Sequence, residues 1–167
     1  DPSIEIITLS PNDGGGFCTC GNCRAMDAPD GPKVWNYVAL TDRYVKFWNQ
    51  LARGLRERFP ERDVRLGAYA YSAYATPPVR ESLEPNIVVA YVGSFPLNPP
   101  AVREAQRQVW KDWAGRTSMM WYRPNLWYWG GGIWGLPEVA MRHTAEDFRF
   151  LAEHRCVGLE VDGYRGY

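Results

Sequence analysis

Residues 4–9 (IEIITL) run directly into residues 10–23 (SPNDGGGFCTCGNC), and the fold is best inferred from this junction. The apolar, β-branched first segment predicts a buried strand. The second segment carries an amide, an acid, three glycines and three cysteines, and a glycine run suits a backbone that bends sharply or lies against a ligand. In an α/β barrel, active sites are built where such a strand ends in a loop. The stretch therefore predicts either a functional loop or a turn with a structural cysteine cluster.

Strands and helices alternate along the rest of the chain. Strands are expected at residues 4–9, 64–70, 87–92, 117–123 and 156–161, and helices at residues 41–59, 100–114 and 144–154. This alternation predicts a parallel α/β sheet. An open doubly wound sheet is the alternative, but no G-x-G-x-x-G follows a strand and opens a helix, and no P-loop is present.

We therefore expect the C-terminal part, about five strands, of a (β/α)8 TIM-type barrel. Residues 1–167 would form a single domain, a partial barrel cut from a longer chain, because a half barrel has open strand edges and is not expected to stand alone. The missing strands would then belong to the same polypeptide.

Three local patterns refine this expectation. Residues 10–40 form a long loop, which in a compact domain is usually functional or stapled. The helix over 41–59 begins at Thr41 as N-cap, and its apolar face is expected from Tyr44, Phe47, Trp48, Leu51 and Leu55. Thr144 and Asp147 have the spacing of a capping box at the start of the last helix.

The charge and hydropathy of the sequence argue against nucleic acid and membrane as partners. The 19 basic residues balance the 19 acidic ones, which argues against a nucleic-acid groove with its basic excess. No apolar run approaches the roughly 18 residues of a membrane span. No charged and then apolar leader is present, and because the chain opens almost directly on a strand, any leader would lie outside it.

Aromatic residues are abundant, with eight Trp, ten Tyr and six Phe. They serve either as large core residues or as platforms for flat ligand faces such as sugar rings. Residues 124–142 concentrate them around Trp129 and a glycine run, which indicates either a sugar-binding loop or a plug that packs against missing domains.

If the strands are parallel, their carboxyl ends share one rim. The rim candidates are Asn12, Asp13, Tyr69, Tyr71, Tyr91, Ser94, Trp121, Tyr122, Glu160 and Asp162. The residues expected to bind substrate are Tyr69, Tyr71, Tyr91, Trp121, Tyr122 and Asp162, together with Trp129. Glycoside hydrolysis uses one carboxyl to protonate the leaving oxygen and a second group to stabilise or trap the oxocarbenium ion. The acids on this rim predict that chemistry, although an acid after a strand is also a common cap or turn residue. Asp42 and Arg43 are interpreted as helix-start charges.

Cys18, Cys20 and Cys23 form a C-x-C-x-x-C pattern with three states left open: a structural zinc site, a local disulfide or free thiols. Zinc would need a fourth ligand, and Cys156, at the start of a strand, is expected at the opposite end of the barrel. A catalytic zinc site is not expected, because the chain has only two histidines. A thiol nucleophile would need a nearby base, for which we assign no residue.

The sequence resembles a bacterial domain-of-unknown-function family, numbered 4838, over nearly the whole chain. Its pattern of strand, Asn-Asp, glycine and C-x-C-x-x-C is found in residues 10–23. Weaker matches are Asp42-Arg43-Tyr44 with Phe47 and Asn49, Phe59-Pro60, Leu66-Gly67-Ala68-Tyr69, Pro77-Pro78, Pro85-Asn86-Ile87-Val88-Val89 and Val157-Gly158-Leu159-Glu160. The resemblance implies a barrel-type glycoside hydrolase, related to α-glucuronidase-like proteins and to endo-β-N-acetylglucosaminidases.

The resemblance also implies roles for individual residues. In barrel hexosaminidases the acetamido oxygen of the substrate attacks the anomeric carbon, and two neighbouring polar residues after the fourth strand orient it and supply the acid. If the first strand here is the fourth of the barrel, Asn12 orients the acetamido group and Asp13 is the acid, although the usual pair is more acidic. Glu160 matches the second acid of the family, as acid or nucleophile. Residues 92–97 replace a cysteine-rich stretch of the family, so the substrate can differ.

Three functions are therefore carried forward. The first is a glycoside hydrolase that needs no cofactor and cleaves a glycan, such as a β-N-acetylglucosaminide by substrate-assisted retaining catalysis. The second is a non-catalytic carbohydrate-binding barrel, and the third is a metal-stapled structural domain of a larger enzyme. A secreted, periplasmic or cell-surface location in a bacterium is expected.

Overall fold

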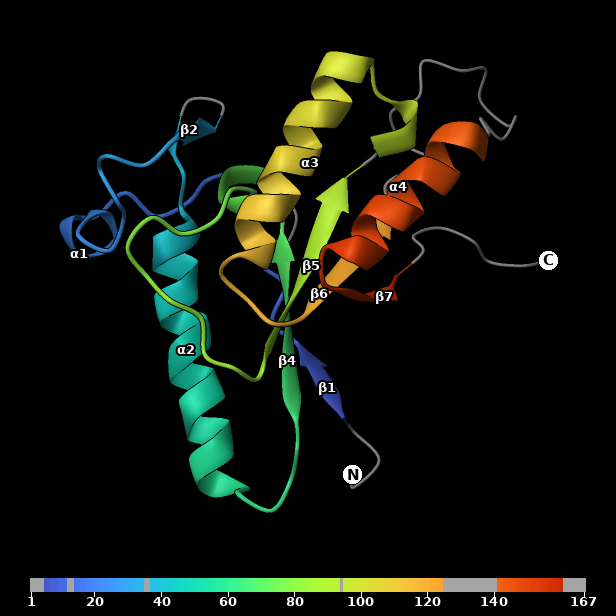
Figure 1. The fold of residues 1–167 in the computed structure, drawn as a ribbon. Helices are drawn as coiled ribbons and strands as arrows, with labels where there is room; N and C mark the ends of the chain where they lie inside the picture. Colours follow the sequence, from blue (N-terminus) through green and yellow to red (C-terminus); the bar gives the residue numbers. More distant parts are fainter. Residues whose placement is uncertain (1–4, 12–13, 35–36, 94, 125–140, 161–167) are drawn as a thin grey trace.

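A five-stranded sheet in which all neighbouring strands are parallel forms the centre of the molecule (Figure 1). The computed structural model describes residues 5–11, 14–34, 37–93, 95–124 and 141–160. In spatial order the strands are β1 (Ile6–Thr8), β4 (Arg65–Ala70), β5 (Ile87–Gly93), β6 (Met120–Pro124) and β7 (Cys156–Leu159). Each overlaps a strand predicted from the sequence, so the expectation of a five-stranded parallel α/β sheet is confirmed.

The strands follow one another in space in the order in which they follow along the chain. Three long helices provide connections: α2 (Thr41–Arg58) before β4, α3 (Pro100–Ala114) before β6 and α4 (Met141–Glu153) before β7. Figure 1 shows these helices on the same side of the sheet, and their side chains share one core with it. We call the side of the sheet that packs on these helices the helix face, and the other side the open face. Among the described strands, β1 and β7 lie at the two edges.

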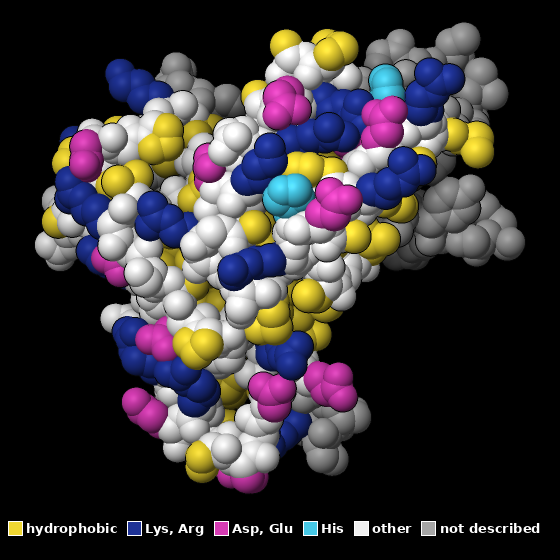
Figure 2. Space-filling view, in the orientation of Figure 1, with side chains coloured by type: hydrophobic (Ala, Val, Ile, Leu, Met, Phe, Trp, Pro, Cys, Tyr) yellow, Lys and Arg dark blue, Asp and Glu magenta, His cyan; other side chains and the backbone are white. Residues whose placement is uncertain are grey.

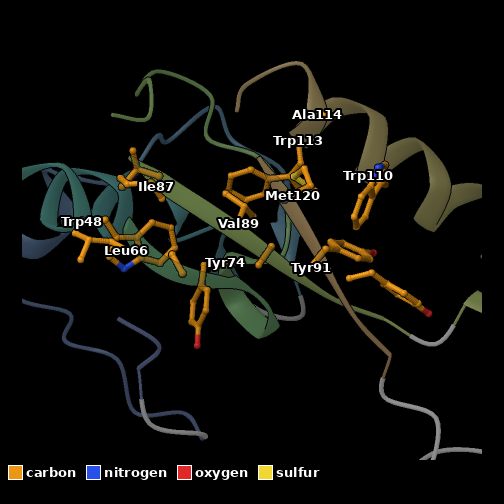
Figure 3. Close-up of a cluster of buried hydrophobic side chains, with 14 of the residues drawn as sticks. Trp48, Leu66, Tyr74, Ile87, Val89, Tyr91, Trp110, Trp113, Ala114 and Met120 are labelled. Carbon is orange, nitrogen blue, oxygen red and sulfur yellow. The ribbon is translucent and has the colours of Figure 1, made fainter. Parts of the chain in front are cut away.

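The core on the helix face is built from aromatic rings (Figure 3). Phe95 belongs to the short turn η2 (Phe95–Leu97), and its ring stacks between those of Tyr91 and Tyr122, with centroid distances of 5.6 and 5.1 Å. Trp110 of α3 packs its ring edge-on against all three. Such offset and edge-to-face pairs add specific geometry to the burial of apolar area. The stack fixes α3 against β5 and β6.

The predicted long loop over residues 10–40 contains short regular elements. These are the single-turn helix α1 (Gly21–Arg24) and an antiparallel pair of β2 (Lys33–Val34) with β3 (Tyr37–Val38). The connection between β4 and β5 is irregular as expected, apart from the turn η1 (Ser72–Tyr74). No helix of the described residues is long and apolar enough to cross a membrane.

The helices occupy the predicted segments, but two details of the prediction are wrong. Residues buried on α2 include Val45, Trp48 and Ala52, whereas Phe47 and Leu51 are exposed. The N-cap of α2 is Leu40, and the Thr41 hydroxyl instead donates to the carbonyl oxygen of Thr76. The apolar face of α2 is rotated relative to the predicted one, because polar residues of this helix point inward and hold the connection between β4 and β5.

The buried carboxylate of Asp42 anchors that loop. Its oxygens accept hydrogen bonds from the backbone N–H groups of Val79, Arg80 and Glu81 at 2.8 to 2.9 Å. Asn49, two turns further along α2, donates to the carbonyl oxygen of Ser82 and accepts from the N–H of Glu84. A buried backbone N–H is costly to leave without a partner, so these two side chains determine the course of the β4–β5 connection.

A second buried carboxylate joins α3 to α4. Asp147 is fully buried and accepts from the guanidinium groups of Arg103 and Arg107. Figure 2 shows the basic and acidic side chains of this region next to each other over α3 and α4. The predicted capping box is wrong, because α4 already begins at Met141 and places Thr144 inside the helix. Asp147 therefore pairs between helices instead of facing the start of its own.

Replacement of Asp147 by Ala is expected to lower the free energy of unfolding by about 3 kcal/mol, because it leaves two partly buried guanidinium groups without their shared carboxylate. The matched control is Glu146→Ala, which removes an exposed carboxylate that bonds Arg103 at 2.8 Å. That control should cause a much smaller loss, since exposed ion pairs contribute little. Urea denaturation followed by circular dichroism measures both. Equal losses for the two variants would contradict the assignment.

Candidate functional site

Three polar side chains meet on the open face of the sheet, near the carboxyl ends of its strands. They are Tyr69 of β4, Arg123 of β6 and Glu160, which directly follows β7. Side chains alternate between the two faces along a strand, so Tyr69 points away from the helix face that buries Ala68 and Ala70. We call these three residues the rim cluster.

Strand register explains why the rim cluster forms. Tyr122 of β6 pairs with Leu159 of β7, so the next residues, Arg123 and Glu160, come to lie beside each other. Tyr69 pairs with Ala90 of β5. Because the Ala90 side chain is small, the Tyr69 ring can extend across β5 toward the other two.

The carboxylate of Glu160 is held from two sides. The Tyr69 hydroxyl donates to Oε1 of Glu160 at 2.8 Å, and Nε of Arg123 lies 3.3 Å from the same oxygen. The Arg123 guanidinium also lies over the Tyr69 ring, 4.8 Å from its centroid, an attractive cation–π arrangement. The Glu160 side chain is 39% exposed and that of Arg123 is 21% exposed. The site thus offers an oriented carboxylate that a ligand can still reach.

Trp121 lies on the open face as well, at the same register as Tyr69, because both residues pair with Ala90 of β5. It contributes to a hollow of about 500 Å³ whose other lining residues include Glu5, Arg65 and Val88. A Cβ at Gly158 would come within 2.7 Å of the indole nitrogen, so the absent side chain lets Trp121 lie against β7. Trp121 is therefore on the open face, and the hollow that it lines lies near the amino ends of β1 and β4.

The structure contradicts the rim position of two tyrosines. Tyr91 and Tyr122 are buried in the helix-face core, where the Tyr122 hydroxyl donates to the carbonyl oxygen of Gly93 at 3.0 Å. Burial also raises the pKa of both phenols above its usual value. Their assignment as substrate-binding residues is wrong, because strand alternation turns them away from the open face.

The remaining predicted residues divide into two groups. Tyr71 is half-buried after β4 and packs against the core. Outside the described residues lie Asn12, Asp13, Ser94, Trp129 and Asp162. Among the described rim candidates, a side-chain hydrogen bond on the open face joins Tyr69 to Glu160, whereas Tyr91 and Tyr122 pair with each other on the helix face. Arg123 was missed, although its position two residues after Trp121 places both on one face of a strand.

Cys18, Cys20 and Cys23 form a second cluster, in the loop between β1 and α2. Their sulfur atoms all lie within 4.8 Å of one another, and all four cysteines of the chain are free thiols. We call these three residues the thiol cluster; it could bind a metal ion. Cys156 is not part of it, since it packs against the helix-face core.

Hydrogen bonding separates the pKa values of two of these thiols. The backbone N–H of Cys23, followed by the thiols of Cys18 and Cys23, lowers the pKa of Cys20 to about 7. Hydrogen bonds involving Cys18 and Cys20 raise the pKa of Cys23 to about 11. Cys20 is therefore the readily ionised member of the thiol cluster.

Arg43 of α2 fastens this loop from both sides. Its guanidinium donates to the carbonyl oxygen of Cys18 at 2.9 Å and, through Nε and Nη2, to both carboxylate oxygens of Asp27 at 2.9 and 2.7 Å. The bond to Asp27 is the main cause that raises the pKa of Arg43. Bidentate pairs of this kind are strong and directional. The interpretation of Arg43 as a mere helix-start charge is therefore wrong.

In metal-free, reduced protein, Cys20 is expected to be alkylated by iodoacetamide before Cys23. Because its pKa is lowered, the thiolate of Cys20 increases as pH rises through about 7, and the rate should be half-maximal there. Cys23, with its raised pKa, should react slowly until the pH approaches 11. Peptide mass spectrometry after timed labelling from pH 5 to 9 measures both rates. Equal rates at neutral pH would contradict the hydrogen-bond pattern.

Comparison with known families finds one match across residues 1–165, to the family described as "Domain of unknown function (DUF4838)". Searches of curated proteins and of solved structures found no match. The match confirms the family expected from residues 10–23 and the weaker motifs. The relationship to glycoside hydrolases stays a prediction.

Proposed function

The chain belongs to the domain-of-unknown-function family DUF4838, and from this premise we propose that it carries part of the active site of a glycoside hydrolase. The observation that supports the proposal is the Glu160 carboxylate, oriented by Tyr69 and Arg123 yet partly exposed on the open face. Glycosidases need such a fixed carboxyl beside the sugar, together with a second polar group across it.

The fold proposed for this activity is part of a (β/α)8 barrel. Sequential strand order, parallel pairing and helices on one face are the features that a barrel segment would have. Further strands of the same polypeptide would pair with β1 and β7 and would enclose the open face. The rim cluster would then lie at the carboxyl end of the barrel, where the active sites of such enzymes are found.

Asp13 is proposed as the general acid. Leu9 donates its N–H to the carbonyl oxygen of Gly67, which fixes the end of β1 beside β4. Asp13 follows Leu9 by four residues in the sequence, so the proposal for it rests on its place in the chain shortly after β1.

In the preferred scheme the substrate is a β-N-acetylglucosaminide, and its acetamido oxygen is the nucleophile. Asn12 would orient that group and Asp13 would protonate the leaving oxygen. Glu160 would stabilise positive charge as it develops on the sugar ring, because Tyr69 and Arg123 both contact Oε1 and leave Oε2 to face the ligand. Should the substrate lack an acetamido group, Glu160 would be the nucleophile with Asp13 as the acid, or the acid in place of Asp13.

Aromatic side chains would bind the sugar rings. Trp121, on the open face, is the described candidate, and Trp129 and Asp162 are proposed in the same role from the sequence. The reaction itself requires no cofactor, so a metal ion at the thiol cluster would be structural. A secreted, periplasmic or cell-surface protein acting on an external glycan is the setting that we propose.

The alternative is a non-catalytic carbohydrate-binding barrel. It is favoured by the position of Trp121, whose indole lies against Gly158 within a hollow. In that case the aromatic residues would be needed for binding and the acids would be dispensable.

The first test is sugar release by the full-length protein. We would assay aryl N-acetylglucosaminides, aryl glucuronides and an N-glycosylated protein, with Asp13→Ala and Glu160→Gln beside the wild type. Each variant is expected to lose at least about 100-fold in kcat, since each removes a group needed in the transition state. Glu153→Gln, an exposed carboxylate on α4, is the matched control and should be unaffected.

Two outcomes would contradict this proposal. Hydrolysis that persists in Glu160→Gln at the wild-type rate would remove Glu160 from the reaction. Glycan binding without release, unchanged by both acid substitutions, would instead support the carbohydrate-binding alternative.

The Tyr69→Phe substitution tests whether the hydrogen bond from Tyr69 to the Glu160 carboxylate contributes to catalysis. It keeps the ring under Arg123 and removes only the hydrogen bond to Glu160, so kcat should fall about 10-fold or more while KM changes little. The matched control is Tyr44→Phe, on α2 and away from the rim cluster, which should retain activity. Steady-state kinetics on the best aryl glycoside measures both. If the two variants behave alike, the hydrogen bond at Oε1 has no catalytic importance.

A further inference from the structure

We infer that Cys18, Cys20 and Cys23 form a zinc site that staples the loop between β1 and α2, with the three sulfur atoms as ligands. The inference does not depend on the proposed hydrolysis. It rests on the geometry of the thiol cluster, on how its loop is held and on the chemistry of three neighbouring thiols.

The sulfur atoms are already close to a metal-binding arrangement. All of them lie within 4.8 Å of one another. With Zn–S bonds of about 2.3 Å, tetrahedral geometry places sulfur atoms about 3.8 Å apart. Movements of about 1 Å or less, within the range of side-chain rotation, would bring the thiol cluster to that spacing.

The loop that carries the thiol cluster is ordered by hydrogen bonds within the protein. Arg43 joins the carbonyl oxygen of Cys18, the first residue of the cluster, to the carboxylate of Asp27, four residues after its last. Within the loop, the N–H of Arg24 donates to the carbonyl oxygen of Cys20 and that of Met26 to Cys23. Because these contacts order the backbone, zinc binding would cost little conformational entropy.

Arg43 also fits the charge of such a site. Three thiolates exceed the charge of one Zn²⁺ ion by a single negative charge, and the guanidinium lies beside Cys18. Arg43 is therefore a positioning residue for the site. It contacts the backbone of one ligand and fixes the loop, as partners outside the ligand shell do in other metal sites.

A disulfide explains the arrangement less completely. A bond between any two members of the thiol cluster would leave the third thiol exposed and without a role. Cys156 cannot pair with it, since its side chain packs into the helix-face core. Zinc would bind all three sulfur atoms at once, and water would take the fourth position.

Zinc content of the full-length protein tests this inference. Protein purified under reducing conditions and loaded with Zn²⁺ should retain one ion per chain after desalting. Cys18→Ser, Cys20→Ser and Cys23→Ser should each lose it, whereas Cys156→Ser should retain it as the matched control. Arg43→Ala keeps every ligand and should weaken zinc affinity at least about 10-fold, measured by competition with a chromogenic chelator.

Cobalt substitution tests the inference on the wild-type protein alone, so its result does not depend on whether the variants fold. A Co²⁺-loaded protein should show intense thiolate-to-metal absorption in the near ultraviolet, of the strength expected for three sulfur ligands. Absence of that absorption, or failure of the reduced protein to bind Zn²⁺, would overturn the inference. So would a disulfide between two of these cysteines in the protein as isolated, or equal zinc loss in Cys156→Ser.

Discussion

The first turn of α2 is the constraint on which the β4–β5 connection and the loop with the thiol cluster both depend. Asp42 accepts the backbone N–H groups of the β4–β5 connection, and the next residue, Arg43, holds the loop that carries the thiol cluster. This helix terminus therefore holds parts of two long irregular segments, while Asn49, further along α2, holds the later part of the β4–β5 connection. The contacts of Asp42 and Arg43 lie toward the carboxyl ends of the strands, and from there the β4–β5 connection returns along α2 to the amino end of β5 (Figure 1).

The two faces of the sheet have separate roles. The helix face is filled by stacked aromatic rings, which makes the core rigid and leaves little polar chemistry there. The open face carries small residues such as Gly67, Ala90 and Gly158, and these give room to a few large or charged side chains. Tyr69, Trp121, Arg123 and Glu160 occupy that room, which makes the open face the natural side for a ligand.

Much of the fold could be predicted from sequence because strand and helix periodicity are local properties. The five strands of the parallel sheet and the three long helices were predicted, whereas α1, β2 and β3, within the loop over residues 10–40, were not. The sequence could not show which aromatic residues are buried, since β5 is apolar on both faces and its pattern does not identify the covered one. Tyr91 was misplaced for that reason, and Arg123 was missed because its partner Glu160 lies on another strand and only strand register brings them together.

The central claim is that Glu160, held by Tyr69 and Arg123, contacts a sugar on the open face. The most direct measurement is a crystal structure of the full-length protein, with Asp13 replaced by Ala to slow turnover, soaked with the best glycan substrate. The account predicts a sugar ring above the open face, with a ring or substituent oxygen within hydrogen-bond distance of the Glu160 carboxylate. An open face filled by other parts of the polypeptide, or a sugar bound away from Glu160, would contradict it.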